Sequence, residues 1–143
     1  MKRIIISVTN DLVTDQRVGK TCELLSETGY DVLLVGRKLK KSFSIQRNYR
    51  TKRFRLLFNK GILFYTEYNI RLFLFLLFTK KDMLFSNDLD TLLPNYIIGK
   101  LQNKKLVFDS HELFSEIPEL VNKQQVKKVW LFLEKTIIPK LQN

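Results

Sequence analysis

Along the chain, short runs of apolar residues alternate with segments whose apolar residues recur every three or four positions, as on one face of a helix. Residues 3–8 form a continuous apolar strand that ends at polar residues 9–11. A helix is predicted to begin at Asp15 or Gln16, with Asp15 as its N-cap, and to stop at Gly29. Its apolar face comprises Val18, Cys22 and Leu25. Residues 32–36 form a second strand, so this segment predicts a βαβ unit with a right-handed crossover and a parallel sheet.

The later elements repeat this pattern. In chain order we predict a strand at 53–56 near the sheet edge, a helix at 62–78, a strand at 82–86, a helix around 92–101 with Pro94 in its first turn, a strand at 105–109 and a helix at 118–135 that Pro139 prevents from continuing. The run 106–108 is typical of a fully buried strand. The expected fold class is α/β, a doubly wound, mostly parallel sheet with helices on both faces, in one domain over 1–143.

The segment 62–78 is unusually apolar. Its only charged residues, Glu67 and Arg71, are spaced to pair across one helical turn. As a membrane span it is short and interrupted, since only 72–78 lacks polar residues. Two alternatives stay open: a helix buried on most sides, and a helix that docks against a partner or a bilayer surface.

The composition indicates the size of the core and the compartment of the protein. The chain has 143 residues and is 45% hydrophobic, which is enough for a sizeable core. Its single cysteine, Cys22, forms neither a disulfide pair nor a metal-ligand motif, and we expect it in the core of a protein from a reducing compartment. The first apolar run ends too early for a signal peptide. We therefore expect a cytoplasmic protein.

The formal charge of +11 is concentrated between residues 37 and 60, which contain ten Lys or Arg and no acidic residue. The predicted membrane- or anion-binding residues are Arg37, Lys38, Lys40, Lys41, Arg50, Lys52 and Arg53. Such a run attracts any polyanion, including nucleic acid. The adjacent apolar segment favours anionic lipid, and a merely solvated loop is the third alternative.

Acidic residues gather after the first, fourth and fifth predicted strands. These eight of the fourteen are Asp11, Asp15, Asp88, Asp90, Asp109, Glu112, Glu116 and Glu119. Parallel strands open on one edge of the sheet, where ligands bind in such folds. Carboxylates accept hydrogen bonds from sugar hydroxyls, so an acidic rim suits polyhydroxyl ligands. The alternative is that they cap helices, which we favour for Asp15 and Glu119.

His111 is the only histidine, and it follows a strand between Asp109 and Glu112. An imidazole in that setting changes charge near neutral pH, which makes it a candidate catalytic group. The sequence contains no G-x-G-x-x-G, no G-x-x-x-x-G-K-[ST], no G-x-S-x-G and no Cys/His metal spacing. This argues against a nucleotide-binding enzyme that is complete in itself.

Five segments, in order and spacing, carry a resemblance to a known family: 10–18, 59–71, 87–94, 108–112 and 117–120. Together they resemble the N-terminal half of a bacterial glycosyltransferase of family 4, also called group 1, with the GT-B fold. The resemblance implies two Rossmann-like domains, of which 1–143 is the acceptor-side domain and a C-terminal nucleotide-sugar-binding domain is absent from this chain. Family members often have a glycine-rich first loop, which 10–15 lacks.

The resemblance also implies an activity. The full-length enzyme would move a hexosyl group, with retention, from a nucleoside diphosphate sugar to a glycan or lipid-linked acceptor in cell-surface polysaccharide biosynthesis. No metal or other cofactor is implied, and the isolated chain is expected to be inactive. His111 matches the family's histidine and would be catalytic. The expected acceptor-binding residues are Asp11, Asp15, Arg17, Asn87, Asp88, Asp90, Asp109 and Glu112.

Several alternatives accompany this interpretation. Arg17 would meet a phosphate of donor or acceptor, or else form a surface salt bridge. The chain would be cytoplasmic, with a peripheral position at the inner face of the plasma membrane as an open alternative. A free-standing flavodoxin-like binding domain and a basic nucleic-acid-binding module are the competing function classes.

Overall fold

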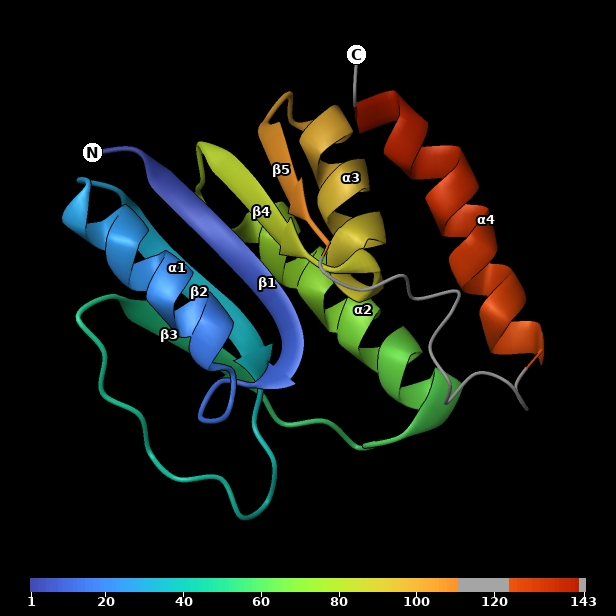
Figure 1. Cartoon of the computed structure of the whole chain (residues 1–143), viewed down its shortest axis with the longest axis horizontal. Coiled ribbons are helices and arrows are strands. Elements are labelled where there is room, and N and C mark those ends of the chain that lie inside the picture. The colour runs from blue at the N-terminus through green and yellow to red at the C-terminus, as the bar shows by residue number, and fades with distance from the viewer. Residues whose placement is uncertain (111–123, 142–143) are drawn as a thin grey trace.

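A twisted sheet of parallel strands organises the computed structural model, which describes residues 1–110 and 124–141 (Figure 1). The sheet has five strands in the order β3-β2-β1-β4-β5. The elements are β1 (Arg3–Asp11), α1 (Gln16–Glu27), β2 (Asp31–Arg37), β3 (Arg50–Phe54), α2 (Gly61–Phe78), β4 (Met83–Asn87), the 3-10 turn η1 (Leu89–Thr91), α3 (Leu92–Leu101), β5 (Lys105–Asp109) and α4 (Gln124–Leu141).

The central strand β1 is paired on both sides. Ile5 lies in register with Leu33 of β2 and with Leu84 of β4. All four strand pairs are parallel, which confirms the predicted sheet. The chain first builds outward from β1 to β3 and then crosses back to β4, so the order of strands reverses between β1 and β4. This reversal is the topological switch point of the fold.

Helices cover both faces of the sheet, as predicted (Figure 1). Successive residues of β1 point to opposite faces, so Ile4 and Ile6 pack with α1 while Ile5 packs with α2. Cys22 is fully buried on α1, and burial raises the pKa of its thiol to about 12. This confirms its predicted place in the core. Gly29 follows the end of α1 with φ 96, the left-handed conformation that glycine adopts readily.

Two strand predictions need correction. β5 is an edge strand, and Val107 is 37% exposed, so the prediction of a fully buried strand was wrong. Leu106 and Phe108 pack against the helices of one face, whereas the side chains that alternate with them point away. The third strand lies at the opposite edge, as predicted, but spans Arg50–Phe54 rather than 53–56.

Two helix predictions also need correction. α4 continues through Pro139 to Leu141, because a proline so close to the helix end removes only one backbone hydrogen bond while Ile137 stays buried against the domain. α2 is not buried on most sides. Its buried residues are Phe64, Tyr68, Leu72 and Leu76, which form a single stripe facing the sheet.

The outer side of α2 is apolar and open, with Ile62, Ile70 and Leu74 each half exposed. By length and composition alone, α2 is the one helix in the described parts of the chain able to cross a membrane, with a mean hydropathy of 1.3 and 22% of its residues buried. Its inner stripe nevertheless packs on the sheet, and the predicted Glu67–Arg71 pair forms at 3.0 Å. The alternative of a docking surface therefore stays open.

Candidate functional site

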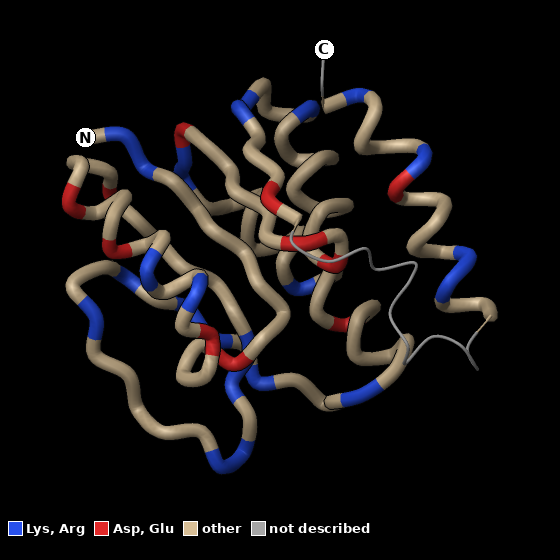
Figure 2. Tube along the Cα trace, in the orientation of Figure 1, with Lys and Arg blue, Asp and Glu red and all other residues tan. Residues whose placement is uncertain are grey.

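Polar side chains meet where β1, β4 and β5 end, at the carboxyl edge of the sheet. Asp11 ends β1, Asn87 is the buried last residue of β4 and is followed by Asp88, and Asp109 ends β5. Figure 2 shows acidic residues at these strand ends. The place coincides with the reversal of strand order between β1 and β4, where ligands bind in open α/β sheets.

Arg17, in the first turn of α1, links two of these carboxylates. Its guanidinium lies 3.1 Å from the Asp109 carboxylate and 3.6 Å from that of Asp88. The Arg17 side chain is 39% exposed, and exposed pairs of this kind contribute at most about 1 kcal/mol to stability. The predicted salt bridge is therefore present, and its main effect is to hold one cation between the ends of β4 and β5.

Two neighbouring residues at the end of β4 are held in unfavourable states. Asp88 has φ 64 and ψ 168, a conformation that is close to glycine-only and costs roughly 1–3 kcal/mol. Its backbone N–H donates to the carbonyl of Asp109 at 2.8 Å, which fixes this geometry. Asn87 is 2% exposed, and its side-chain nitrogen has no hydrogen-bond partner within residues 1–110 and 124–141. Such costs concentrate at functional sites.

Asp90 is more deeply placed than the rim prediction implies. It is buried, and its carboxylate accepts a hydrogen bond of 2.5 Å from the Thr9 hydroxyl. Its backbone carbonyl accepts from the Asn69 side chain at 3.0 Å. Asp90 thus fastens η1 to both β1 and α2, and its contact with an acceptor stays a prediction.

Asp15 and Asp11 have structural partners. Asp15 is the N-cap of α1 and accepts from the Val18 amide at 3.2 Å, which confirms the capping alternative. Asp11 is buried and accepts from the Ser42 hydroxyl and from the backbone amide of Leu39. Burial by itself raises the pKa of Asp11, but these hydrogen bonds and the Arg53 charge outweigh it and hold the pKa below its usual value. Acceptor contacts for both residues remain predictions.

The predicted catalytic residue His111 and its neighbour Glu112 lie outside the described residues, as do Glu116 and Glu119. Their roles remain sequence-based predictions. The site that the structure describes therefore consists of Arg17, Asn87, Asp88 and Asp109, with Asp90 beneath it. The described residues contain no group of three or more His, Cys, Asp or Glu that could hold a metal ion.

The predicted basic surface divides into two sets. The three arginines are engaged within the domain: Arg37 lies 4.3 Å over the Phe64 ring, Arg50 pairs with Asp31, and Arg53 donates to Ser42 and Phe43. The lysines of the set are Lys38, Lys40, Lys41 and Lys52, and they form no ion pair with any described residue. Their binding to membranes or anions remains a prediction.

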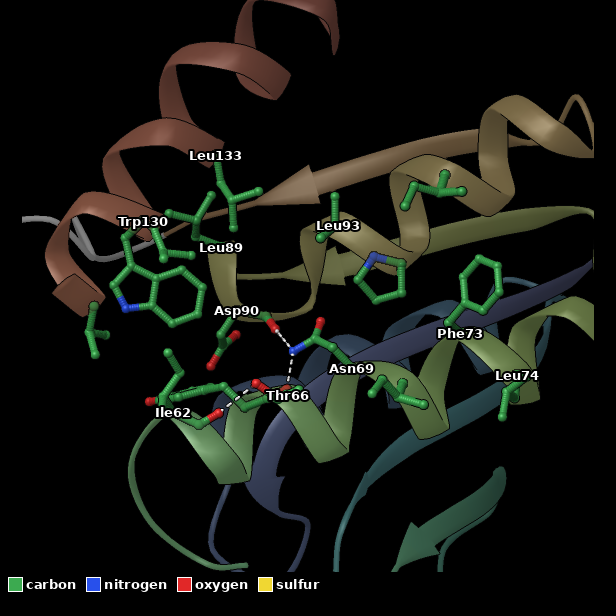
Figure 3. A pocket seen from close by; sticks show the side chains of 16 residues that line it. Ile62, Thr66, Asn69, Phe73, Leu74, Leu89, Asp90, Leu93, Trp130 and Leu133 are labelled. Atoms are coloured by element: carbon green, nitrogen blue, oxygen red, sulfur yellow. Dashed lines mark hydrogen bonds between the residues drawn. The ribbon is translucent and has the colours of Figure 1, made fainter.

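Sequence reasoning missed a large apolar groove between α2, α3 and α4 (Figure 3), with a volume of about 500 Å³. It is lined by Ile62, Tyr65, Thr66, Asn69, Ile70, Phe73, Leu74, Leu89, Asp90, Leu93, Pro94, Ile97, Val126, Val129, Trp130 and Leu133. The apolar positions 62, 70, 74 and 78 lie on one side of α2 and are exposed, but the sequence contains no local signal of this, because the helix is apolar on nearly all sides.

Comparisons with known proteins show a likeness in structure only. No protein-family model and no curated protein sequence matches the chain. Among solved structures, the chain is similar to SsfS6, a glycosyltransferase of Streptomyces sp. SF2575, with a TM-score of 0.55 and 10% sequence identity. The likeness covers 99% of this chain and 47% of that one, so the chain spans about half its length. An identity this low supports a shared Rossmann-like α/β fold and does not establish family 4.

The contacts of Asp11 predict a pH-dependent loss of stability. A carboxyl group whose pKa is lower in the folded than in the unfolded state stabilises the fold above its unfolded pKa, near 3.8, and this contribution disappears as pH falls through the folded pKa. Asp11→Asn should lower the free energy of unfolding at pH 7 by about 1.5–3 kcal/mol, because hydrogen bonds to an ionised group are lost.

Urea unfolding at a series of pH values checks this expectation. The difference between wild type and Asp11→Asn should shrink steadily below pH 3.8. Glu23→Gln, at an exposed position of α1, is the matched removal of one carboxylate and should change little. A difference between wild type and Asp11→Asn that stays constant down to pH 2 would contradict the structural role of the ionised form.

Proposed function

We propose that this chain is the acceptor-binding half of a retaining glycosyltransferase that transfers a sugar from a nucleoside diphosphate sugar to a glycan or lipid-linked acceptor. One observation carries the proposal. At the switch point of a fold similar to a glycosyltransferase, Asp88 is strained beside the buried amide of Asn87, which has no partner in the described residues. A bound polyhydroxyl ligand offers both donors and acceptors to such a pair.

In this proposal the strand ends orient the acceptor. The Asp88 carboxylate accepts a hydrogen bond from an acceptor hydroxyl, and Arg17 fixes the direction of the carboxylates of Asp88 and Asp109 through its ion pairs with both. The Asn87 amide donates to an acceptor oxygen. Holding the acceptor hydroxyl in one orientation lowers the entropic cost of the reaction. This is the main contribution of an acceptor domain to catalysis.

The donor would be bound by a second, nucleotide-sugar-binding domain. The likeness to SsfS6 supports this division, since the chain corresponds to about half of that protein. The charge that develops on the leaving diphosphate would be stabilised there by basic and backbone groups. We assign no metal or cofactor to this half, and we expect the chain alone to be inactive.

The basic lysines and the outer face of α2 support a peripheral position at the inner face of the plasma membrane. Lys40, Lys41 and Lys52 are exposed, and Lys60 directly precedes α2 with its half-exposed apolar side chains. Anionic lipid attracts such lysines, which would bring the acceptor site close to lipid-linked substrates.

Asp88→Gly tests whether the strain at Asp88 serves binding. Glycine adopts φ 64 and ψ 168 freely, so the free energy of unfolding should rise by about 1 kcal/mol, even after the loss of the Arg17 contact and the greater freedom of glycine in the unfolded chain. In the full-length enzyme the same change should raise the Michaelis constant for the acceptor and leave that for the donor unchanged.

Asn103→Gly is the matched control. Asn103, with φ 50, is the other described non-glycine residue of positive φ, and it lies just before β5, at the amino ends of the strands and away from the carboxyl edge. Asparagine tolerates this conformation, so stability and acceptor binding should change little. Asp88→Gly enzyme with an unchanged Michaelis constant for the acceptor would contradict the proposed role of Asp88.

The proposed catalytic role of His111 is tested in the full-length enzyme. If its side chain contacts the reacting sugar in the transition state only, His111→Ala should lower kcat and kcat/KM together by about a hundredfold or more, with little change in donor affinity. Circular dichroism verifies the fold. Near-normal turnover would leave His111 without a catalytic role.

A further inference from the structure

Two segments leave the sheet at its carboxyl edge, next to β2 and β3. Residues 38–49 follow β2, and residues 55–60 join β3 to α2 (Figure 1). The two segments begin side by side, because the backbone amide of Lys38 donates to the carbonyl of Phe54 at 2.9 Å. The candidate acceptor site lies where β1, β4 and β5 end, so the two segments form the neighbouring part of the same edge.

Both segments present large apolar side chains to the solvent. Phe43 is 77% exposed, and Leu57 and Phe58 are 81% and 45% exposed. Ile62 and Leu63, in the first turn of α2, are also half exposed, so four of these side chains are close together in sequence. Single exposed apolar residues are common on protein surfaces, whereas a group of them generally marks an interaction surface.

The backbone of the first segment is tied to the sheet at Ser42 and Phe43. Asp11, at the end of β1, accepts a hydrogen bond from the Ser42 hydroxyl at 2.9 Å. Arg53 of β3 donates to the same hydroxyl at 2.9 Å and to the carbonyl of Phe43 at 3.0 Å. The Phe43 side chain is therefore exposed on a backbone that the domain holds in place.

Glu67 of α2 holds the second segment in the same way. Its carboxylate accepts from the backbone amides of Leu57 and Phe58, at 2.9 Å from each. The Glu67 side chain is only 13% exposed, and the Asp11 side chain is 7% exposed. Each segment is thus fixed by a carboxylate that faces the protein, while its apolar side chains face the solvent.

Every charged residue of the two segments is basic. Exposed examples are Lys40 and Lys41 in the first segment and Arg55 and Lys60 in the second (Figure 2). None of these four forms an ion pair with a described residue, and residues 32–66 contain no Asp or Glu. Apolar side chains among uncompensated cations match the interface of an anionic bilayer, in which hydrocarbon lies beneath negative headgroups.

We propose that this part of the carboxyl edge is the surface that meets an anionic bilayer, with Phe43 and Leu57 as the inserted side chains. The lysines and arginines would lie among the lipid headgroups, and the two apolar side chains would reach below them. This orientation rests on the peripheral position proposed above, and it requires no transfer reaction. It would place the candidate acceptor site beside the membrane surface.

Sedimentation with vesicles tests this surface. The chain should bind vesicles that contain phosphatidylglycerol and should not bind phosphatidylcholine alone. Leu57→Ser should weaken binding roughly tenfold, because a leucine side chain no longer leaves water. Leu101→Ser is the matched control, since Leu101 is 66% exposed, follows Lys100 and lies at the amino ends of the strands. It should leave binding unchanged, and neither change should unfold the domain, because both side chains are exposed.

A fluorescent label reports insertion at a single residue. Cys22 is the only cysteine and is fully buried, which raises the pKa of its thiol to about 12, so a thiol-reactive label should attach only to an introduced cysteine. Brominated lipid should quench the label on Phe43→Cys and on Leu57→Cys. The same label on Leu101→Cys should not be quenched.

Four results would overturn the proposed surface. Binding without quenching at 43 or 57 would mean that the cations alone adsorb to the vesicles. Quenching at Ile70→Cys but not at 43 or 57 would assign the contact to the outer face of α2 and leave the peripheral position intact. Tighter binding to a DNA oligonucleotide than to vesicles, unchanged in Leu57→Ser, would assign the cations to nucleic acid. Absence of binding to phosphatidylglycerol vesicles would refute the peripheral position as well, while the acceptor constant of Asp88→Gly enzyme tests the transferase role separately.

Discussion

The structure depends on a buried hydrogen-bond network that joins β1 to the segment after β4. Thr9 bonds the Asp90 carboxylate, while the hydroxyls of Ser86 and Thr91 lie 2.7 Å apart and Asn95 donates to Ser7. All these residues are buried, so each polar group needs a partner within the protein. The network fixes the start of α3 where strand order reverses, which opens the carboxyl edge between β1 and β4.

Because the network fixes this edge, the chain can hold the two residues at the end of β4 in states that cost free energy. The conformation of Asp88 costs roughly 1–3 kcal/mol, and so does the buried Asn87 side-chain nitrogen, which has no partner among the described residues; a typical domain stability is about 5–15 kcal/mol. A domain selected for stability alone would have glycine at position 88. Position 88 instead carries an acidic side chain beside Arg17. This pairing makes the carboxyl edge a candidate binding site.

The sheet and the position of the site were predictable, because β1 and β2 are continuous apolar runs and parallel strands must end at a common edge. The exposure of β5 was not predictable, since it depends on which helix covers each face of an edge strand. The open face of α2 was equally hidden, because a helix that is apolar on nearly all sides gives no sign of which side meets the sheet. Asp11 and Arg17 find partners 28 and 92 residues away, beyond any local pattern.

We propose that the carboxyl edge at the switch point receives a sugar acceptor and that the donor binds elsewhere. Backbone amide chemical shifts of the isotope-labelled chain, titrated with oligosaccharide probes and separately with UDP-glucose, test it most directly. An oligosaccharide should perturb residues 9–17 and 87–90, and UDP-glucose should perturb none of the described residues strongly. Tight binding of UDP-glucose, or sugar-induced shifts confined to the opposite edge around Asn103, would contradict it.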